Sequence, residues 1–169
     1  LVMELCSNTL VNILAAGPLE RHHTRVYASQ LLHALAFLDS MHVRHFDVKP
    51  ANILLKNDAV KLCDFGLSVH DEAIDEDLVC TVRYRPLEVT YGGCLDKVDV
   101  WSAGAVVYEM CRGRPLCVGR TVGQVRREIF AHVGYPQNPH VDVGPRFVHD
   151  GLRAVAAAAV PRRRLMEDP

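Results

Sequence analysis

The residues between positions 43 and 55 constrain this chain more than any other stretch, because they bring three chemically different polar groups into one short loop. They read Val-Arg-His-Phe-Asp-Val-Lys-Pro-Ala-Asn-Ile-Leu-Leu, so that Asp47, Lys49 and Asn52 lie within a few positions of one another. A second carboxylate, Asp64, follows Asn52 by twelve residues in the triplet Asp-Phe-Gly. Two aspartates, an asparagine and a lysine that converge on one cleft are typical of a site for a metal ion and phosphate groups, with a base directed at a hydroxyl.

The overall composition is that of an ordinary globular domain. The chain has 169 residues, of which 49% are hydrophobic and 23% are charged, and this is enough for one domain with a substantial core. A formal net charge of −1 gives no reason to expect a nucleic-acid partner or attraction to a membrane surface. The longest apolar runs are far shorter than the roughly 20 residues that span a bilayer, and the start does not resemble a signal peptide.

The cysteine pattern bears on the cellular compartment. The six cysteines are scattered along the chain without a Cys-x-x-Cys pair. This pattern argues against a zinc site and against a disulfide framework, and it suits a reducing environment. We therefore expect an intracellular protein, in the cytoplasm, the nucleus or both.

Apolar spacing and turn-forming residues predict a mainly α-helical chain with one small β-hairpin. Residues 20–41 carry apolar side chains at helical spacing and should form a long, largely buried helix that leads to the polar loop. The apolar runs 53–55 and 60–63 flank a turn and should form a hairpin that ends on Asp64. Such a hairpin would place Asn52 and Asp64 close enough to share metal ions. The remaining expectations are an irregular acidic loop at 67–79, a second buried helix at 96–111 and an alanine-rich helix at 152–160.

The polar loop and the Asp-Phe-Gly triplet together resemble a known family. The loop around Asp47 resembles the catalytic loop of eukaryotic protein kinases, and residues 64–66 resemble their metal-binding triplet. Residues 80–88 resemble the segment that receives the substrate, although they end in Pro-Leu-Glu where the family has Ala-Pro-Glu. The Tyr-Arg pair at 84–85 resembles the branch that contains the cyclin-dependent and mitogen-activated kinases.

The resemblance implies a role for each polar residue of the loop, with ATP and Mg²⁺ as cofactors. Asp47 would accept or orient the proton of the substrate hydroxyl, and Lys49 would stabilise the transferred phosphoryl group. Asn52 would bind one magnesium ion, and Asp64 would bridge magnesium to the phosphates. Lys49, together with Thr81 beside the substrate loop, favours serine or threonine over tyrosine as the acceptor.

The resemblance also assigns residues to the nucleotide. Residues 1–9 would be the last strand of the amino-terminal lobe and the hinge. The cysteine before Asp64 is either a reactive thiol that faces the nucleotide or, as the safer interpretation, an inert buried cysteine. The residues assigned to the nucleotide are Met3 at the gatekeeper position, Glu4 and Cys6 through their backbone, Leu54 beneath the adenine ring, Cys63, and Asp64.

Several further residues have supporting roles in this resemblance. Asp99, near the start of an apolar helix, would accept hydrogen bonds from the backbone of the catalytic loop. Glu88 would pair with Arg164 and anchor the end of the substrate-receiving segment; alternatively, residues 162–164 are a solvated basic run. The other supporting residues are His45 of the catalytic loop and Phe65 and Gly66 of the metal-binding triplet.

Phe46 is the main departure from the family pattern. The family usually has arginine at this position, and that arginine pairs with a phosphorylated residue of the acidic loop segment. Phe46 cannot form this charge-assisted pair, and the aligned position of the phosphorylated threonine holds Glu76. We therefore hypothesise that phosphorylation of this loop does not control the protein. Arg83 stands where close relatives have tryptophan, so the resemblance does not decide whether a proline must follow the phosphorylated residue.

The parts of a kinase that precede the hinge are not recognisable in this sequence. It shows no glycine-rich phosphate loop, no strand lysine and no helix glutamate of the kind that an amino-terminal lobe supplies. The resemblance therefore implies a partial kinase domain over residues 1–169, an α+β kinase fold without most of its amino-terminal lobe, in which residues 10–169 are the carboxyl-terminal lobe. Such a fragment would not be a competent kinase alone.

Two functions remain as alternatives. The first is a serine/threonine protein kinase with a protein substrate and a cyclin-like or scaffold partner, and the presence of Asp47, Asn52 and Asp64 favours it. The second is a pseudokinase or a truncated kinase-like module that binds proteins without catalysis. Phe46 and the altered Pro-Leu-Glu triplet favour the second.

Overall fold

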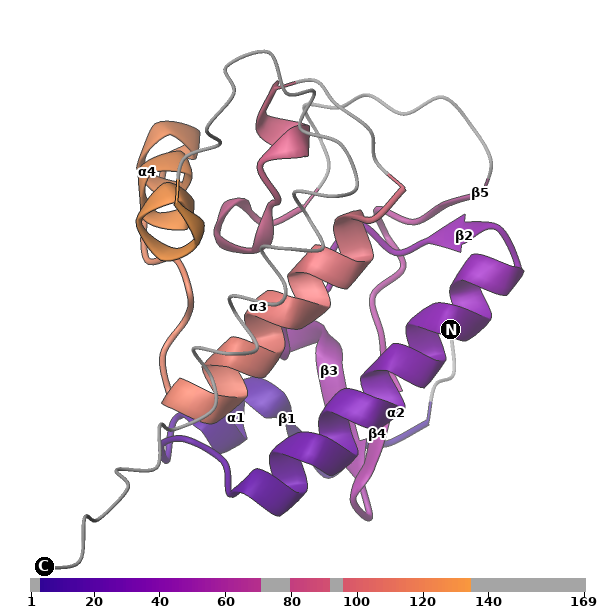
Figure 1. The fold of residues 1–169 in the computed structure, drawn as a ribbon. Helices are drawn as coiled ribbons and strands as arrows, with labels where there is room; N and C mark the ends of the chain where they lie inside the picture. Colours follow the sequence, from indigo (N-terminus) through magenta and orange to yellow (C-terminus); the bar gives the residue numbers. More distant parts are fainter. Residues whose placement is uncertain (1–3, 71–79, 92–95, 135–169) are drawn as a thin grey trace, which may run out of the picture.

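The computed structural model describes residues 4–70, 80–91 and 96–134 (Figure 1). Over these residues the chain forms helices and small antiparallel sheets, as expected for a mainly helical kinase-like domain. The predicted helix at 152–160 lies outside them. The strands are β1 (Asn8–Thr9), β2 (Val43–Arg44), β3 (Ile53–Lys56), β4 (Ala59–Leu62) and β5 (Val69–His70). The helices are α1 (Leu10–Leu14), α2 (Arg21–Ser40), α3 (Val98–Arg112) and α4 (Val122–Val133), with 3₁₀ turns at Pro50–Asn52, Val82–Tyr84 and Glu88–Tyr91.

Helices α2 and α3 pack against each other, and α3 lies between α2 and α4 (Figure 1). Helix α2 buries Tyr27, Leu31 and Leu35 along one side, as its helical spacing predicts. Helix α3 is apolar over most of its length, so it is buried on most sides. Both helices were predicted, with ends that differ by one or two residues from those observed. Together with α1 and the hairpin they enclose the largest apolar cluster of the described residues.

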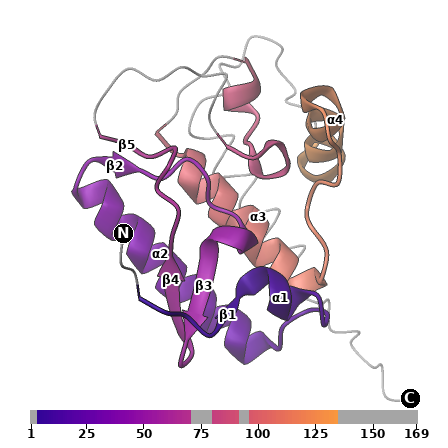
Figure 2. The same cartoon turned by 180° about the vertical axis from the view of Figure 1, so that it is seen from behind.

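Strands β3 and β4 form the predicted hairpin, with β1 on the other edge of β3 (Figure 2). Asn57 and Asp58 between them have positive φ angles of 50° and 61°, the geometry of a two-residue turn that these side chains tolerate well. The turn is bound to α2: the Tyr27 hydroxyl donates to Asp58 Oδ1 at 3.2 Å, and the Val60 N–H donates to Gln30 Oε1 at 2.6 Å. These bonds set the position of the residues that follow β4.

Strand β5 corrects the prediction that the chain is irregular from residue 67 onward. Val69 and His70 pair antiparallel with Arg44 and Val43 of β2. The two-residue pairing had no signal of its own in the sequence, because its stability comes from the neighbouring strand and not from a periodic run. Residues 71–79, the rest of the predicted acidic loop, lie outside the described residues.

Helix α4 packs on the opposite side of α3 from α2 (Figures 1 and 2). It begins with a capping box, in which Thr121 and Gln124 each bond to the other's backbone N–H. Its buried Val125 and Ile129 lie in a second apolar cluster with Trp101 of α3 and residues that precede α4. Among the described residues, no helix combines the length and the apolarity that crossing a membrane requires.

Gly113 ends α3 and provides a test of this packing. Its φ is 66°, and a Cβ at this position would lie 2.8 Å from the backbone nitrogen of Pro18. We predict that Gly113→Ala lowers the free energy of unfolding by about 1–3 kcal/mol, because the left-handed backbone and the contact with a rigid proline are both unfavourable. Urea denaturation monitored by circular dichroism measures this change.

Gly123 is the matched control, since a Cβ there would have no neighbour within 4 Å and the residue lies in the first turn of α4. Gly123→Ala should leave the free energy of unfolding unchanged or raise it by up to about 1 kcal/mol. Equal destabilisation by the two substitutions would contradict the position of α3 against Pro18.

Candidate active site

The polar loop is anchored to the start of α3 by the Asp99 carboxylate. Asp99 Oδ2 accepts the His45 N–H at 2.7 Å, and Oδ1 accepts the Phe46 N–H at 2.8 Å. Burial raises the pKa of the Asp99 carboxyl, although the two amide donors act in the opposite direction. The loop bends sharply at this point, where Phe46 has a φ of 62°. This left-handed conformation is unfavourable for a bulky residue, so the two short bonds to Asp99 are what maintain it.

His45 joins the loop to the residues that follow β4. Its Nδ1 accepts the Asp47 N–H at 3.2 Å, so the ring proton is on Nε2, which donates to the Cys63 carbonyl at 3.0 Å. The fully buried ring also packs edge-on against Phe65, with 4.8 Å between the ring centroids. Ser68 donates to the His45 carbonyl at 3.2 Å. The resemblance placed His45 and Phe65 in supporting roles but gave no signal for Ser68.

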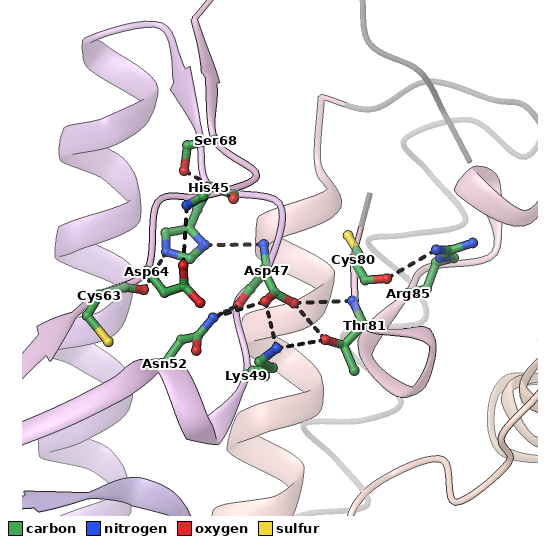
Figure 3. A network of polar contacts seen from close by, with 11 residues as sticks. His45, Asp47, Lys49, Asn52, Cys63, Asp64, Ser68, Cys80, Thr81 and Arg85 are labelled. Carbon is green, nitrogen blue, oxygen red and sulfur yellow. Dashed lines mark hydrogen bonds and ion pairs between the residues drawn. The ribbon is translucent and has the colours of Figure 1, made fainter. Parts of the chain in front are cut away.

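Asp47 lies at the centre of a network of hydrogen bonds (Figure 3). Oδ2 accepts from Lys49 Nζ at 2.7 Å and from Asn52 Nδ2 at 3.1 Å. Oδ1 accepts from the Thr81 hydroxyl at 2.7 Å and from the Thr81 N–H at 3.3 Å. Burial acts to raise the pKa of Asp47, but the hydrogen bonds from Lys49 and Thr81 outweigh it and lower the pKa below its ordinary value. Asp47 is therefore a carboxylate with its charge stabilised from several directions.

Thr81 comes to this network from a distant part of the chain. It lies just before the 3₁₀ turn Val82–Tyr84, and its hydroxyl also accepts from Lys49 Nζ at 3.0 Å. Cys80, the residue before it, has a φ of 64°, and its carbonyl accepts from Arg85 Nη2 at 3.1 Å. In the sequence, Arg85 was noted only as part of the Tyr-Arg pair that resembles the family branch, and its contact with Cys80 was not predicted. The left-handed backbone at Cys80 had no signal, because cysteine has no preference for it.

Asn52 and Asp64 are brought together by the hairpin. The Asn52 carbonyl accepts the Cys63 N–H at 3.0 Å, so Asp64 follows immediately after a residue that is bonded to Asn52. The Asn52 amide nitrogen donates to the Asp47 carbonyl at 2.9 Å as well as to its carboxylate, which orients the buried Asn52 side chain. Asp64 is exposed with a φ of 64°, and its Oδ1 accepts the Gly66 N–H at 3.4 Å. Figure 3 shows the Asp64, Asn52 and Asp47 side chains gathered in one place.

The oxygen ligands in this place fit magnesium better than a transition metal. Since both hydrogen bonds of the Asn52 side chain described above use its nitrogen, its oxygen is the atom available to a cation, beside the exposed Asp64 carboxylate. Among the described residues, no three His, Cys, Asp or Glu side chains form a metal cluster. Magnesium is commonly bound by one or two protein oxygens and completes its shell with phosphate and water oxygens. Asn52 and Asp64 satisfy this requirement.

The residues assigned to the nucleotide lie along the hairpin and the segment before β1, except Met3, which is outside the described residues. Glu4 is exposed, and its carboxylate pairs with Lys56 at 3.0 Å and with Lys61 at 3.5 Å, so it binds this segment to the hairpin. Cys6 and Cys63 are both half-buried, and Leu54 lies between β1 and β4. Burial raises the pKa of Cys63, with further contributions from Asp64 and Cys6. A raised pKa suppresses the thiolate, which favours the inert interpretation of Cys63.

Phe46 is buried among apolar residues. It lies in a third apolar cluster with Cys80, Val89 and Val98, with 0% of its surface exposed. Arg44, two residues before it, donates instead to Asp96 Oδ1 at 2.9 Å. Glu76 is outside the described residues.

A family model described as the protein kinase domain matches residues 1–144. The chain therefore belongs to the protein kinase family.

Its relatives confirm the resemblance to the cyclin-dependent and mitogen-activated branch. The chain is 36% identical over 140 residues to a probable cell division protein kinase of Encephalitozoon cuniculi, over 80% of this chain and 44% of that protein. It is 39% identical over 123 residues to the mitogen-activated protein kinase mpkC of Aspergillus niger, over 71% of this chain and 31% of that protein. It is 38% identical over 136 residues to the protein kinase gsk31 of Schizosaccharomyces pombe, over 76% of this chain and 35% of that protein. The chain thus spans less than half the length of each of these relatives.

The Asp99 contacts predict a large loss of stability on their removal. Asp99→Ala leaves two buried N–H groups without acceptors, so we expect it to lower the free energy of unfolding by about 2–4 kcal/mol. Asp96→Ala is the matched control, because Asp96 is a neighbouring aspartate whose only described bond is an exposed ion pair with Arg44. It should lower the free energy of unfolding by at most about 1 kcal/mol. Similar losses in chemical denaturation would show that Asp99 does not anchor the loop.

Glu88 gives a pH-dependent prediction. Its side chain is 3% exposed, its Oε1 has no hydrogen-bond partner among the described residues, and burial raises its pKa to about 7 from the ordinary 4.5. A carboxyl with a higher pKa in the folded state makes the folded state bind more protons than the unfolded state. Stability from this group is therefore present below its ordinary pKa and is lost as the pH rises to about 7. The predicted partner, Arg164, is outside the described residues; its guanidinium would oppose this loss by stabilising the carboxylate.

If Arg164 is that partner, Arg164→Ala should lower the melting temperature more at about pH 8 than at about pH 5, because the unpaired carboxylate is charged only at the higher pH. Arg162→Ala is the control and should show no such dependence on pH. Differential scanning calorimetry at both pH values measures the effect. Equal shifts for the two variants would favour the solvated basic run instead.

Proposed function

We propose that this chain carries the phosphoryl-transfer centre of an ATP-dependent serine/threonine protein kinase. The observation that carries the proposal is the convergence of Asp47, Lys49 and Thr81 from two distant segments, with contacts of 2.7 Å and 3.0 Å from Lys49 Nζ to Asp47 and Thr81. A surface that only bound proteins would not require Asp47, Lys49 and Thr81 to lie together. The family membership and the relatives' names support the same activity.

In this proposal Asp47 receives the hydroxyl of the substrate. Its carboxylate has a lowered pKa, so it is a weak base and acts mainly by orienting the hydroxyl for attack. It takes the hydroxyl proton as the bond from the acceptor oxygen to the γ-phosphorus of ATP forms and the bond from that phosphorus to the β,γ-bridging oxygen breaks, with ADP as the leaving group. The donors that surround Asp47 keep its oxygens in a defined position. Catalysis of phosphoryl transfer depends mainly on such positioning of the reacting groups.

Lys49 and Thr81 define the acceptor side of the site. The Lys49 ammonium lies between Asp47 and the Thr81 hydroxyl, close to where the transferred phosphoryl group would pass, and it would stabilise that group's negative charge. Thr81 connects the catalytic loop to the segment that receives the substrate. This compact arrangement supports a serine or threonine hydroxyl as acceptor, as the resemblance to the family implies.

Asn52 and Asp64 would bind magnesium through the amide oxygen and the carboxylate. Bound magnesium supplies neutralisation of the charge on the β- and γ-phosphates of ATP. The backbone of Glu4 and Cys6 and the side chain of Leu54 would border the adenine, and Met3 would stand at the gatekeeper position. Phe65 and Gly66 would support Asp64, as their position in the triplet suggests.

We further propose that residues 1–169 are part of a kinase domain, with the last amino-terminal-lobe strand and the hinge at 1–9 and the carboxyl-terminal lobe at 10–169. The fraction of each relative that the chain spans supports this division. The phosphate loop and the strand lysine would come from an amino-terminal lobe. The partners would be a protein substrate and a cyclin-like or scaffold protein, and the free described cysteines suit the cytoplasm or the nucleus.

The alternative is a kinase-like module that binds proteins without catalysis. Phe46 favours it, because the buried phenyl ring replaces the charged residue through which the family links the catalytic loop to a phosphorylated segment. This alternative predicts nucleotide or protein binding with no phosphate transfer.

The test uses the longest naturally expressed protein that contains these residues. It is incubated with radiolabelled ATP and with peptides that differ only in a serine, threonine or tyrosine acceptor. Asp47→Asn should lower the transfer rate by a factor of about 10²–10⁴ and leave nucleotide affinity nearly unchanged, because Asp47 contacts the acceptor and not the nucleotide. Asp64→Asn should instead weaken binding of the magnesium–nucleotide complex.

Asp39→Asn is the control, since Asp39 is an exposed aspartate on α2 outside the network, and it should leave both quantities unchanged. Transfer to tyrosine in preference to serine would contradict the proposed acceptor class. Nucleotide binding by the unaltered protein without any transfer would favour the binding module.

A further inference from the structure

Phe46 and Cys80 are each the residue immediately before a member of the polar network. Phe46 precedes Asp47 on the catalytic loop, and Cys80 precedes Thr81 on the substrate-receiving segment. Phe46 and Cys80 lie together in the third apolar cluster. Thr81 donates two hydrogen bonds to Asp47. The two segments are thus joined by two kinds of contact, apolar packing at Phe46 and Cys80 and hydrogen bonds between Thr81 and Asp47.

The first residue of each pair, Phe46 or Cys80, has an unusual backbone conformation. Phe46 and Cys80 both have left-handed conformations, with φ angles of 62° and 64°. Each is stabilised by a neighbour: the Phe46 N–H donates to Asp99, and the Cys80 carbonyl accepts from Arg85. Backbone conformations of this kind persist only where the surroundings impose them. A contact that depends on both is therefore specific to this arrangement and not a general result of apolar collapse.

The surroundings of Phe46 are apolar among the described residues. Val89 and Val98 complete the cluster, and Val69 of β5 packs against it. Two arginines lie near this cluster: Arg44 pairs with Asp96, and Arg85 donates to the carbonyl of Cys80, which is itself a member of the cluster. The side chain of Phe46 therefore contributes an apolar contact to the link between the two segments, beside the hydrogen bond from Arg85 to Cys80.

On the basis of the proposed function, we infer that Phe46 is a positioning residue whose packing with Cys80 keeps Thr81 against Asp47. The buried ring makes this contact through apolar packing alone. The acceptor side of the site is then assembled in the unmodified protein.

The protein contains two thiols that report on this link. Cys80 is buried in the cluster of Phe46, and Cys117 is buried in the separate cluster of α4. Burial is the largest cause that raises the pKa of each thiol to about 12, so both should react slowly with N-ethylmaleimide in the folded state. Cys117 therefore serves as an internal reference for general loosening of the fold.

The experiment measures alkylation of the two thiols by mass spectrometry and exchange of the Thr81 amide hydrogen, without ATP. Phe46→Ala should increase the alkylation rate of Cys80 and the exchange rate of Thr81 by about tenfold or more, with Cys117 changed less than about twofold. Phe46→Leu, which keeps an apolar side chain, should restore most of the protection. Ile129→Ala, in the cluster of Cys117, is the matched control and should show the reverse pattern, with Cys117 exposed and Cys80 protected.

Equal increases at Cys80 and Cys117 in Phe46→Ala would assign Phe46 a general structural role and overturn the inference. The inference would also be overturned if Phe46→Ala increased the alkylation rate of Cys80 and left the exchange rate of the Thr81 amide unchanged. Because neither measurement depends on phosphate transfer, a protein that fails as a kinase can still confirm the link, and a kinase can still lack it.

Discussion

The contact on which the site depends is that of the Asp99 carboxylate with the N–H groups of His45 and Phe46. It places a charged group in a largely buried position, which is unfavourable unless the charge has hydrogen-bond donors. The loop amides supply those donors and are themselves oriented by the contact. Since Asp99 belongs to the first turn of a long buried helix, the loop acquires the rigidity of α3. All the polar groups that follow in the loop derive their positions from this point.

The same principle operates at Asp47, where several donors converge on one carboxylate. Lys49, Asn52 and Thr81 come from the loop, from the 3₁₀ turn before the hairpin and from a distant segment. Burial acts to raise the pKa of Asp47, but the hydrogen bonds from Lys49 and Thr81 lower it below its ordinary value. An arrangement of this kind favours precise orientation over basicity, which suits a reaction in which position and charge neutralisation provide most of the catalysis.

Phe46 is an apolar residue at a position where the resemblance to the family leads us to expect a charged one. A guanidinium at this position needs a partner that can be added or removed, and the link it makes is therefore conditional. A phenyl ring packed with Cys80 and Val98 needs no such partner, because its stability comes from the removal of apolar surface from water. With Phe46 in this position, the hydrogen bonds between Thr81 and Asp47 are still formed.

The sequence alone determined the elements whose signals are local. The helical spacing of α2 and α3, the turn at Asn57 and Asp58, and the order of the polar residues were all legible, and the family resemblance followed from them. Strand β5, the left-handed backbone of Cys80 and the burial of Phe46 were decided by tertiary structure, because each depends on a neighbour far away in the chain. A one-dimensional pattern records which side chains are present; the contacts that orient the Asp47 carboxylate exist only once distant segments have packed together.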